Sequence, residues 1–71
     1  MSSTKIAIEL NGETREVTVG SSAADLIREL GLREGMVALE VNEKVVPRGL
    51  REATRLAPGD RVELVTMMGG G

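Results

Sequence analysis

The chain of 71 residues contains no cysteine, no histidine and no aromatic residue. Without cysteine there is no disulfide framework, no thiolate nucleophile and no cysteine-ligated zinc or iron–sulfur site. Without histidine the chain lacks the usual general base and the commonest metal ligand. Without Phe, Tyr or Trp it has no platform on which nucleic-acid bases stack. We therefore expect no catalytic centre, no metal site and no bound cofactor.

An excess of charge of one sign and long apolar runs are also missing. Nine basic residues against eleven acidic ones leave a net charge of −2, which argues against a phosphate-binding surface. No apolar stretch approaches the length of a membrane span, and residues 1–5 lack the apolar run of a signal peptide. We expect one cytoplasmic domain over residues 1–71 that binds neither nucleic acid nor membrane, with residues 1–4 disordered.

The chain is rich in glycine at its end, which reads Met67-Met68-Gly69-Gly70-Gly71. Glycine adds chain entropy and contributes nothing to a core, so a glycine run normally belongs to a linker or loop. At a terminus, such a run is either a frayed or cloning-derived end, or its carboxylate is used. Extended, these residues reach roughly 17 Å, and without a Cβ glycine passes through narrow channels. We expect a flexible functional tail over residues 67–71.

The first part of the chain predicts a β-hairpin. Apolar and polar residues alternate over residues 5–10 and again over residues 14–19, where Val17 and Val19 share a face. Asn11-Gly12 lies between them, and this pair is the strongest short hairpin signal because both positions tolerate positive φ.

A short helix is predicted next. Ser21 or Ser22 is placed to cap its first turn, and Asp25 can return a hydrogen bond to the cap. Its apolar face at helical spacing consists of Ala23, Leu26, Ile27 and Leu30. Gly31 follows that face, and it predicts a C-terminal cap with positive φ.

The remainder of the chain predicts three further strands, over residues 37–41, Val45-Val46 and residues 61–65. Pro47 ends the short one because proline cannot donate to a ladder, and Asn42 serves the turn before it. Pro58-Gly59-Asp60 has the chemistry of a type II turn. Residues 50–56 fit either a single helical turn or an irregular crossing.

These elements predict an α+β fold. A single-layer sheet with one helix must bury its apolar face against that helix. Placing the last strand beside the first, and parallel to it, gives a sheet that grasps the helix. We therefore predict a β-grasp (ubiquitin-like) fold, with a mixed sheet of four to five strands on one helix and a flexible C-terminal glycine tail.

Three stretches resemble the ThiS family, the thiamine-biosynthesis sulfur carriers of the ubiquitin-like ThiS/MoaD group. They are Val-Asn-Glu-Lys-Val-Val-Pro-Arg at residues 41–48, Leu-Ala-Pro-Gly-Asp-Arg-Val-Glu-Leu-Val at residues 56–65, and the glycine end. The chain departs from the family pattern at Gly69, where a larger residue usually precedes the diglycine. The likeness spans nearly the whole chain from Ile6.

The resemblance implies a function for the tail. A ubiquitin-activating-like enzyme of the ThiF/MoeB type would use ATP to adenylate the Gly71 carboxylate, and a sulfur donor would convert it to a thiocarboxylate. A thiazole synthase of the ThiG type would receive the sulfur. Four residues would form the part of the tail that enters the partner's channel: Gly70, Gly69, Met68 and Met67. The chain would be a protein co-substrate and not an enzyme.

Other functions stay open at this point. A molybdopterin-synthase small subunit is similar in fold and terminal chemistry, although such subunits usually carry aromatic residues near the tail. A carrier for tRNA thiolation or cysteine synthesis, or a protein-conjugated modifier, would have the same kind of tail. A TGS-like non-covalent binding module resembles the Gly-Asp-Arg-Val stretch, but it has no reason to end in glycines.

Four residues fit two roles each. Met67 and Met68 are suited either to core packing or to adaptable contacts with several partners. Arg48 and Arg51 could contact an acidic partner surface, but we predict them to be solvated charges.

Overall fold

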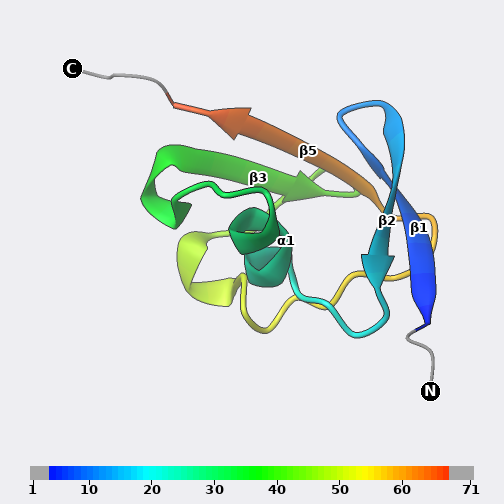
Figure 1. The fold of residues 1–71 in the computed structure, drawn as a ribbon. Coiled ribbons are helices and arrows are strands. Elements are labelled where there is room, and N and C mark those ends of the chain that lie inside the picture. The colour runs from blue at the N-terminus through cyan, green and yellow to red at the C-terminus, as the bar shows by residue number, and fades with distance from the viewer. Residues whose placement is uncertain (1–3, 68–71) are drawn as a thin grey trace.

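The computed structural model describes residues 4–67, and Figure 1 shows a sheet with helix α1 on one of its faces. The predicted disorder of residues 1–3 and the tail residues 68–71 lie outside the described residues. In chain order the elements are β1 (Lys5–Leu10), β2 (Glu13–Thr18), α1 (Ala23–Glu29), the 3₁₀ helix η1 (Glu34–Met36), β3 (Val37–Val41), β4 (Lys44–Val45), the 3₁₀ helix η2 (Arg48–Leu50) and β5 (Arg61–Thr66).

The five strands form one sheet in the order β2-β1-β5-β3-β4. The first hairpin pairs β1 with β2 antiparallel, and β3 pairs antiparallel with both β4 and β5. β5 lies beside β1 and runs parallel to it, although the two strands come from opposite ends of the chain. This contact joins the two hairpin-like halves of the sheet, and the predicted β-grasp fold is confirmed.

Both ends of α1 are capped as the sequence predicts. The Ser22 hydroxyl accepts a hydrogen bond from the Asp25 N–H, and the Asp25 carboxylate accepts one from the Ser22 N–H, each at 3.0 Å. At the other end Gly31 has φ +76°, and the Leu32 N–H donates to the Ile27 carbonyl at 3.1 Å. This is the Schellman arrangement, in which a left-handed glycine lets the next N–H satisfy a free helix carbonyl.

The core lies between α1 and the face of the sheet that α1 covers. Its buried apolar side chains are Ile8, Val17, Ala23, Leu26, Ile27, Val37, Leu39, Val46, Leu56, Val62 and Leu64. The predicted inward faces of the strands and of the helix supply most of them. Val19 is an exception with 53% of its surface exposed, because β2 ends at Thr18 and Val19 no longer follows the alternation of the strand.

The ambiguous stretch over residues 50–56 is a crossing that begins with η2 and continues through turns. It runs along the start of α1, since the Thr54 carbonyl accepts from the Ala23 N–H at 2.8 Å and the Leu56 N–H donates to the Ser21 carbonyl at 2.9 Å. These bonds hold the crossing against the N-terminal end of α1 and place Leu56 in the core.

Arg51 is buried, so the prediction that it is a solvated charge is wrong. Its side chain is only 4% exposed and donates two hydrogen bonds of 2.8 Å, to the carbonyls of Glu34 and Val37. Those carbonyls flank the junction of η1 and β3, where a 3₁₀ turn gives way to a strand and leaves acceptors without helical partners. Arg48, three residues earlier, is exposed as predicted.

Candidate functional site at the C-terminal end of the sheet

β5 leads to the predicted tail, and it lies between β1 and β3 in the middle of the sheet (Figure 1). The predicted modification site and three of the predicted tail residues lie outside the described residues: Gly71, Gly70, Gly69 and Met68. Their roles therefore stay predictions. Met67 is described, and its N–H donates to the Met36 carbonyl at 2.6 Å. The sheet bonding on the β3 side thus continues one residue past β5.

The two edges of β5 are held in different ways. On the β3 side the antiparallel pairing runs from Val62 to Thr66. On the β1 side the parallel ladder covers only Arg61 and Val62, and it closes with a bond from the Asn11 N–H to the Val62 carbonyl at 2.9 Å. Among residues 4–67, no strand accompanies the rest of β5 on this side.

The side chain of Asn11 takes the place of the missing strand. Its amide NH₂ donates to the Leu64 carbonyl at 3.1 Å, and its amide oxygen accepts from the Leu64 N–H at 2.8 Å. An amide side chain carries the same donor and acceptor as a peptide group, so it can continue a ladder by one step. The sequence predicts Asn11 only as a turn residue, and its positive φ of 50° confirms that role. The contact with Leu64 has no signal in the sequence.

Asn42 fastens the beginning of β5 in a similar way. It lies in the turn between β3 and β4 with φ 54°, as predicted. Its amide oxygen accepts from the Arg61 N–H at 2.9 Å, and its NH₂ donates to the Asp60 carboxylate at 3.0 Å. The Asp60 carboxylate also accepts from the Ala57 N–H across the predicted type II turn, in which Gly59 has φ +84°. Two asparagines from two different turns therefore hold β5 in position.

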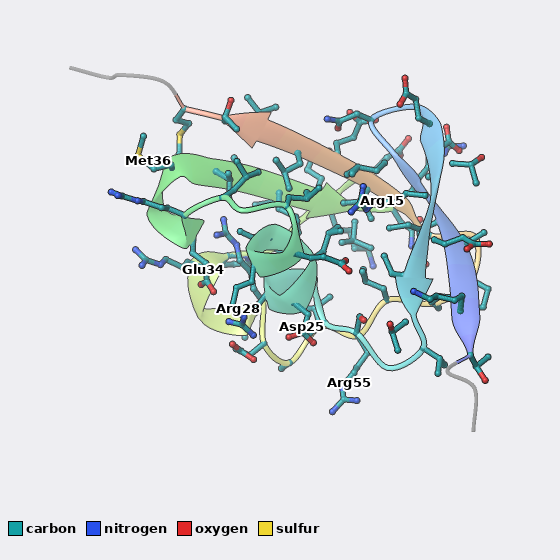
Figure 2. All side chains as sticks on the ribbon, in the orientation of Figure 1. Arg15, Asp25, Arg28, Glu34, Met36 and Arg55 are labelled. Carbon is teal, nitrogen blue, oxygen red and sulfur yellow. The ribbon has the colours of Figure 1, made fainter. Side chains whose placement is uncertain are left out.

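Apolar side chains are exposed where β5 ends. Met67 has 51% of its surface exposed, so it is not part of the core, and its role in contacts with partners stays a prediction. Met36 lies beside it and is also exposed, as Figure 2 shows at the end of β5. Sequence analysis did not single out Met36, because its proximity to Met67 depends on the pairing of β3 with β5.

A cluster of charges lies beside α1, away from the end of β5. Arg28 forms ion pairs with Asp25 at 2.9 Å, Glu52 at 2.9 Å and Glu34 at 3.4 Å, and Figure 2 shows three of these residues together. Hydrogen bonds from the Ser22 backbone and from Arg28 hold the pKa of Asp25 below its ordinary value. The cluster joins α1 to η1 and to the crossing, and its exposure makes each pair weak.

Residues 4–67 contain no pocket and no group of three acidic side chains arranged to hold a metal ion. In the same part of the chain no helix is long and apolar enough to cross a membrane. What the described residues offer next to the predicted tail is an exposed surface around β5.

The chain is similar to known proteins along nearly its whole length. A model of the ThiS family matches residues 8–71. The chain is 39% identical over 64 residues to a thiazole synthase of Magnetococcus marinus, covering 90% of this chain and 20% of that protein. It is 32% identical over 66 residues to the ycf40 protein of Porphyra purpurea, with 93% of each chain covered.

A solved structure agrees with these matches. The crystal structure of the thiamine biosynthesis protein ThiS from Geobacter metallireducens has a TM-score of 0.79 and 29% sequence identity, covering 93% of this chain and 100% of that one. The chain spans only about a fifth of the length of the two thiazole synthases that it matches. A family match over residues 8–71, together with a helix and a sheet arranged as in the Geobacter protein, shows that the chain belongs to the ThiS family.

Proposed function

We propose that the chain is a sulfur carrier of thiamine biosynthesis that acts as a co-substrate and not as an enzyme. The observation that carries this proposal is the family match, which extends through residue 71 and so includes the glycine end. The bonding of β5 supports it. This central strand pairs with β3 as far as Thr66, and the Asn11 side chain forms two hydrogen bonds to Leu64 on its other edge. The strand that leads to the tail is therefore fixed on both edges.

The chemistry that we propose takes place at the Gly71 carboxylate. A carboxylate is a poor electrophile because its charge is delocalised and its oxygen is a poor leaving group. An adenylating enzyme of the ThiF/MoeB type would let a carboxylate oxygen attack the α-phosphate of ATP, releasing pyrophosphate and forming an acyl-adenylate. A sulfur donor would then attack the carbonyl carbon, expel AMP and leave a thiocarboxylate. Glycine suits this step because no side chain crowds its carbonyl.

The proposed acceptor of the sulfur is a thiazole synthase of the ThiG type. Two relatives that bear the name thiazole synthase contain a stretch similar to this chain, at 39% and 34% identity. In those proteins a unit like this chain is part of the synthase polypeptide itself. That association supports the same enzyme as the partner of this chain.

Mass spectrometry of the C-terminal peptide tests the carrier function. With an adenylating enzyme of the ThiF/MoeB type, ATP and a sulfur donor, we expect one terminal oxygen of Gly71 to be replaced by sulfur. ATP alone should change nothing, and a Gly71→Ala variant should react more slowly because its methyl group crowds the carbonyl and restricts the tail. Sulfur on any other residue, or adenylation that survives deletion of Gly70 and Gly71, would contradict the proposal.

A further inference from the structure

The turn of the first hairpin has the covalent structure in which an asparagine side chain deamidates most readily. Asn11 is followed by Gly12, both residues are exposed, and both have positive φ, of 50° and 86°. In deamidation the backbone nitrogen of the following residue attacks Cγ, the carbonyl carbon of the asparagine side chain. Glycine has no Cβ to hinder this approach, and its backbone adopts many conformations. The pair that specifies the hairpin therefore also places a reactive side-chain carbonyl next to an unhindered nitrogen.

The reaction needs no reactant besides water. A bond forms between the Gly12 nitrogen and Asn11 Cγ, the nitrogen gives up its proton, and the bond from Cγ to Nδ2 breaks. The leaving NH₂ group takes up that proton and departs as ammonia, which leaves a succinimide ring. Water then adds to one carbonyl of the ring and opens it. The product is aspartate, or isoaspartate, in which the main chain runs through the side-chain carbons.

In the folded protein Leu64 holds the Asn11 side chain against this reaction. Asn11 Nδ2 donates to the Leu64 carbonyl at 3.1 Å, and Oδ1 accepts from the Leu64 N–H at 2.8 Å, so the hairpin turn lies beside β5 (Figure 1). To close the ring, the side chain has to turn back to its own main chain. An amide that is bonded through both its ends to another strand does this only after both bonds break. The reaction therefore proceeds from molecules in which β5 has separated from the turn, and its rate reports that local opening.

Conversion of Asn11 also changes the contact permanently. An ionised carboxylate only accepts hydrogen bonds, so the oxygen that replaces Nδ2 has nothing to donate to the Leu64 carbonyl, 3.1 Å away in the parent. Two acceptors at such a distance repel each other, and the carbonyl loses its partner. Isoaspartate in addition lengthens the main chain of a two-residue turn, which disturbs the register of the hairpin. On its β1 side the parallel ladder of β5 covers only Arg61 and Val62, so no further ladder pair compensates for the loss at Leu64.

We propose that Asn11 is a site of spontaneous deamidation, held closed by Leu64, and that its reaction loosens β5 on the β1 side. The inference goes beyond the proposed function, because it concerns a covalent change in the body of the domain and not at the tail. The strand affected is nevertheless the one that leads to the tail.

Asn42 provides a contrast within the same chain. It also has positive φ in a tight turn, and its side chain is bonded to the Arg61 N–H and the Asp60 carboxylate. The residue after it is Glu43, whose side chain crowds the attacking nitrogen and whose negative charge opposes loss of the proton from that nitrogen. We therefore expect Asn42 to react far more slowly than Asn11.

Peptide mass spectrometry of the full chain, incubated at mildly alkaline pH with and without urea, tests the site and its protection. The chain contains two asparagines and no glutamine, so the mass gain from replacing NH by O is assigned without ambiguity. In urea Asn11 should be converted and Asn42 should not, and Gly12→Ala should slow the conversion several-fold because its methyl group hinders the attack. The folded protein should react at the same residue but about tenfold or more slowly, because two hydrogen bonds have to break first.

The variant Asn11→Asp reproduces the aspartate product and tests the effect on β5. Its thermal midpoint should be lower than that of the parent by about 4–8 °C. Hydrogen exchange at the Leu64 amide should be faster, because β5 separates more often from the turn. The Val65 amide is the internal control: neighbouring amides of a strand point to opposite edges, so it faces β3 and should keep its exchange rate.

The inference is overturned if Asn11 reacts as fast in the folded protein as in urea, since Leu64 would then give no protection. It is equally overturned if Asn42 reacts as fast as Asn11, or if the folded protein shows no conversion while the unfolded protein is fully converted. An Asn11→Asp variant with the midpoint and the Leu64 exchange rate of the parent would show that the reaction leaves β5 in place. The sulfur-carrier function would stand in each of these cases, because none of the measurements involves Gly71.

Discussion

A single side chain, that of Asn11, supplies the two hydrogen bonds that hold β5 on its β1 side at Leu64. Replacing it with glycine keeps the positive φ of the turn without strain but removes both bonds. We expect Asn11→Gly to lower the free energy of unfolding by about 1–3 kcal/mol, because the polar groups of Leu64 lose their partners. Urea denaturation measures this loss. Hydrogen exchange should also become faster at the Leu64 amide, and an unchanged exchange rate there would contradict the assigned role.

Arg51 is the residue whose environment differs most from the sequence-based prediction. Arg51→Met keeps an unbranched apolar side chain in the same place and removes the donors to the Glu34 and Val37 carbonyls. The variant should lose about 1–3 kcal/mol of stability, because two acceptors at the η1–β3 junction are left without partners. Arg48→Met is the matched control at an exposed position and should stay within about 0.5 kcal/mol of the parent. Equal unfolding midpoints for the two variants would show that the buried bonds contribute nothing.

At the scale of one element, the N-terminus of α1 makes stability depend on pH. The folded-state pKa of Asp25 is lowered, first by the hydrogen bond from the Ser22 backbone and then by Arg28. A carboxylate with a lowered pKa contributes stability that is present above its unfolded value of about 3.9 and is lost as the pH falls through the folded value. In the Asp25→Asn variant the side-chain amide oxygen can still accept the hydrogen bond from the Ser22 N–H, but the side chain no longer titrates.

The urea midpoint of Asp25→Asn should therefore fall less steeply than that of the parent as the pH drops below about 4. Glu29→Gln removes one carboxylate at the exposed far end of the same helix and serves as the control. Its acid-side curve should follow the parent. If the urea midpoints of Asp25→Asn and of the parent fall equally steeply below about pH 4, the titration of Asp25 does not contribute to the pH dependence of stability.

At the scale of the whole molecule, we expect stability and the proposed function to belong to different parts of the chain. Within residues 4–67 the buried apolar side chains lie between Ile8 and Leu64, and the family match continues to residue 71. Deleting residues 68–71 should therefore abolish sulfur loading and shift the thermal midpoint by no more than a surface substitution does. Differential scanning calorimetry beside the mass-spectrometric assay separates the two effects. A clear drop in the midpoint would mean that the glycine end is structural.

The local structure of this protein is determined by its sequence. Alternating apolar and polar residues predict the long strands, and Asn11-Gly12 predicts the hairpin turn. Ser22 and Asp25 predict the start of α1, and Gly31 predicts its end. The β-grasp fold could be predicted because one helix and one sheet with a single apolar face have few ways to bury their apolar surfaces against each other. The strands, the hairpin and the helix caps depend on residues a few positions apart, so local patterns in the sequence are enough to specify them.

Only the tertiary structure decided the contacts between distant residues. Asn11 bonds to Leu64, Arg51 reaches the carbonyls beside η1, and Glu40 stands opposite Glu63. Each of these depends on the register of β5 against its neighbours or on the path of the crossing, and a slip of one residue moves every side chain to the other face. Periodicity excludes a slip of one residue but not a slip of two, which keeps every side chain on the same face.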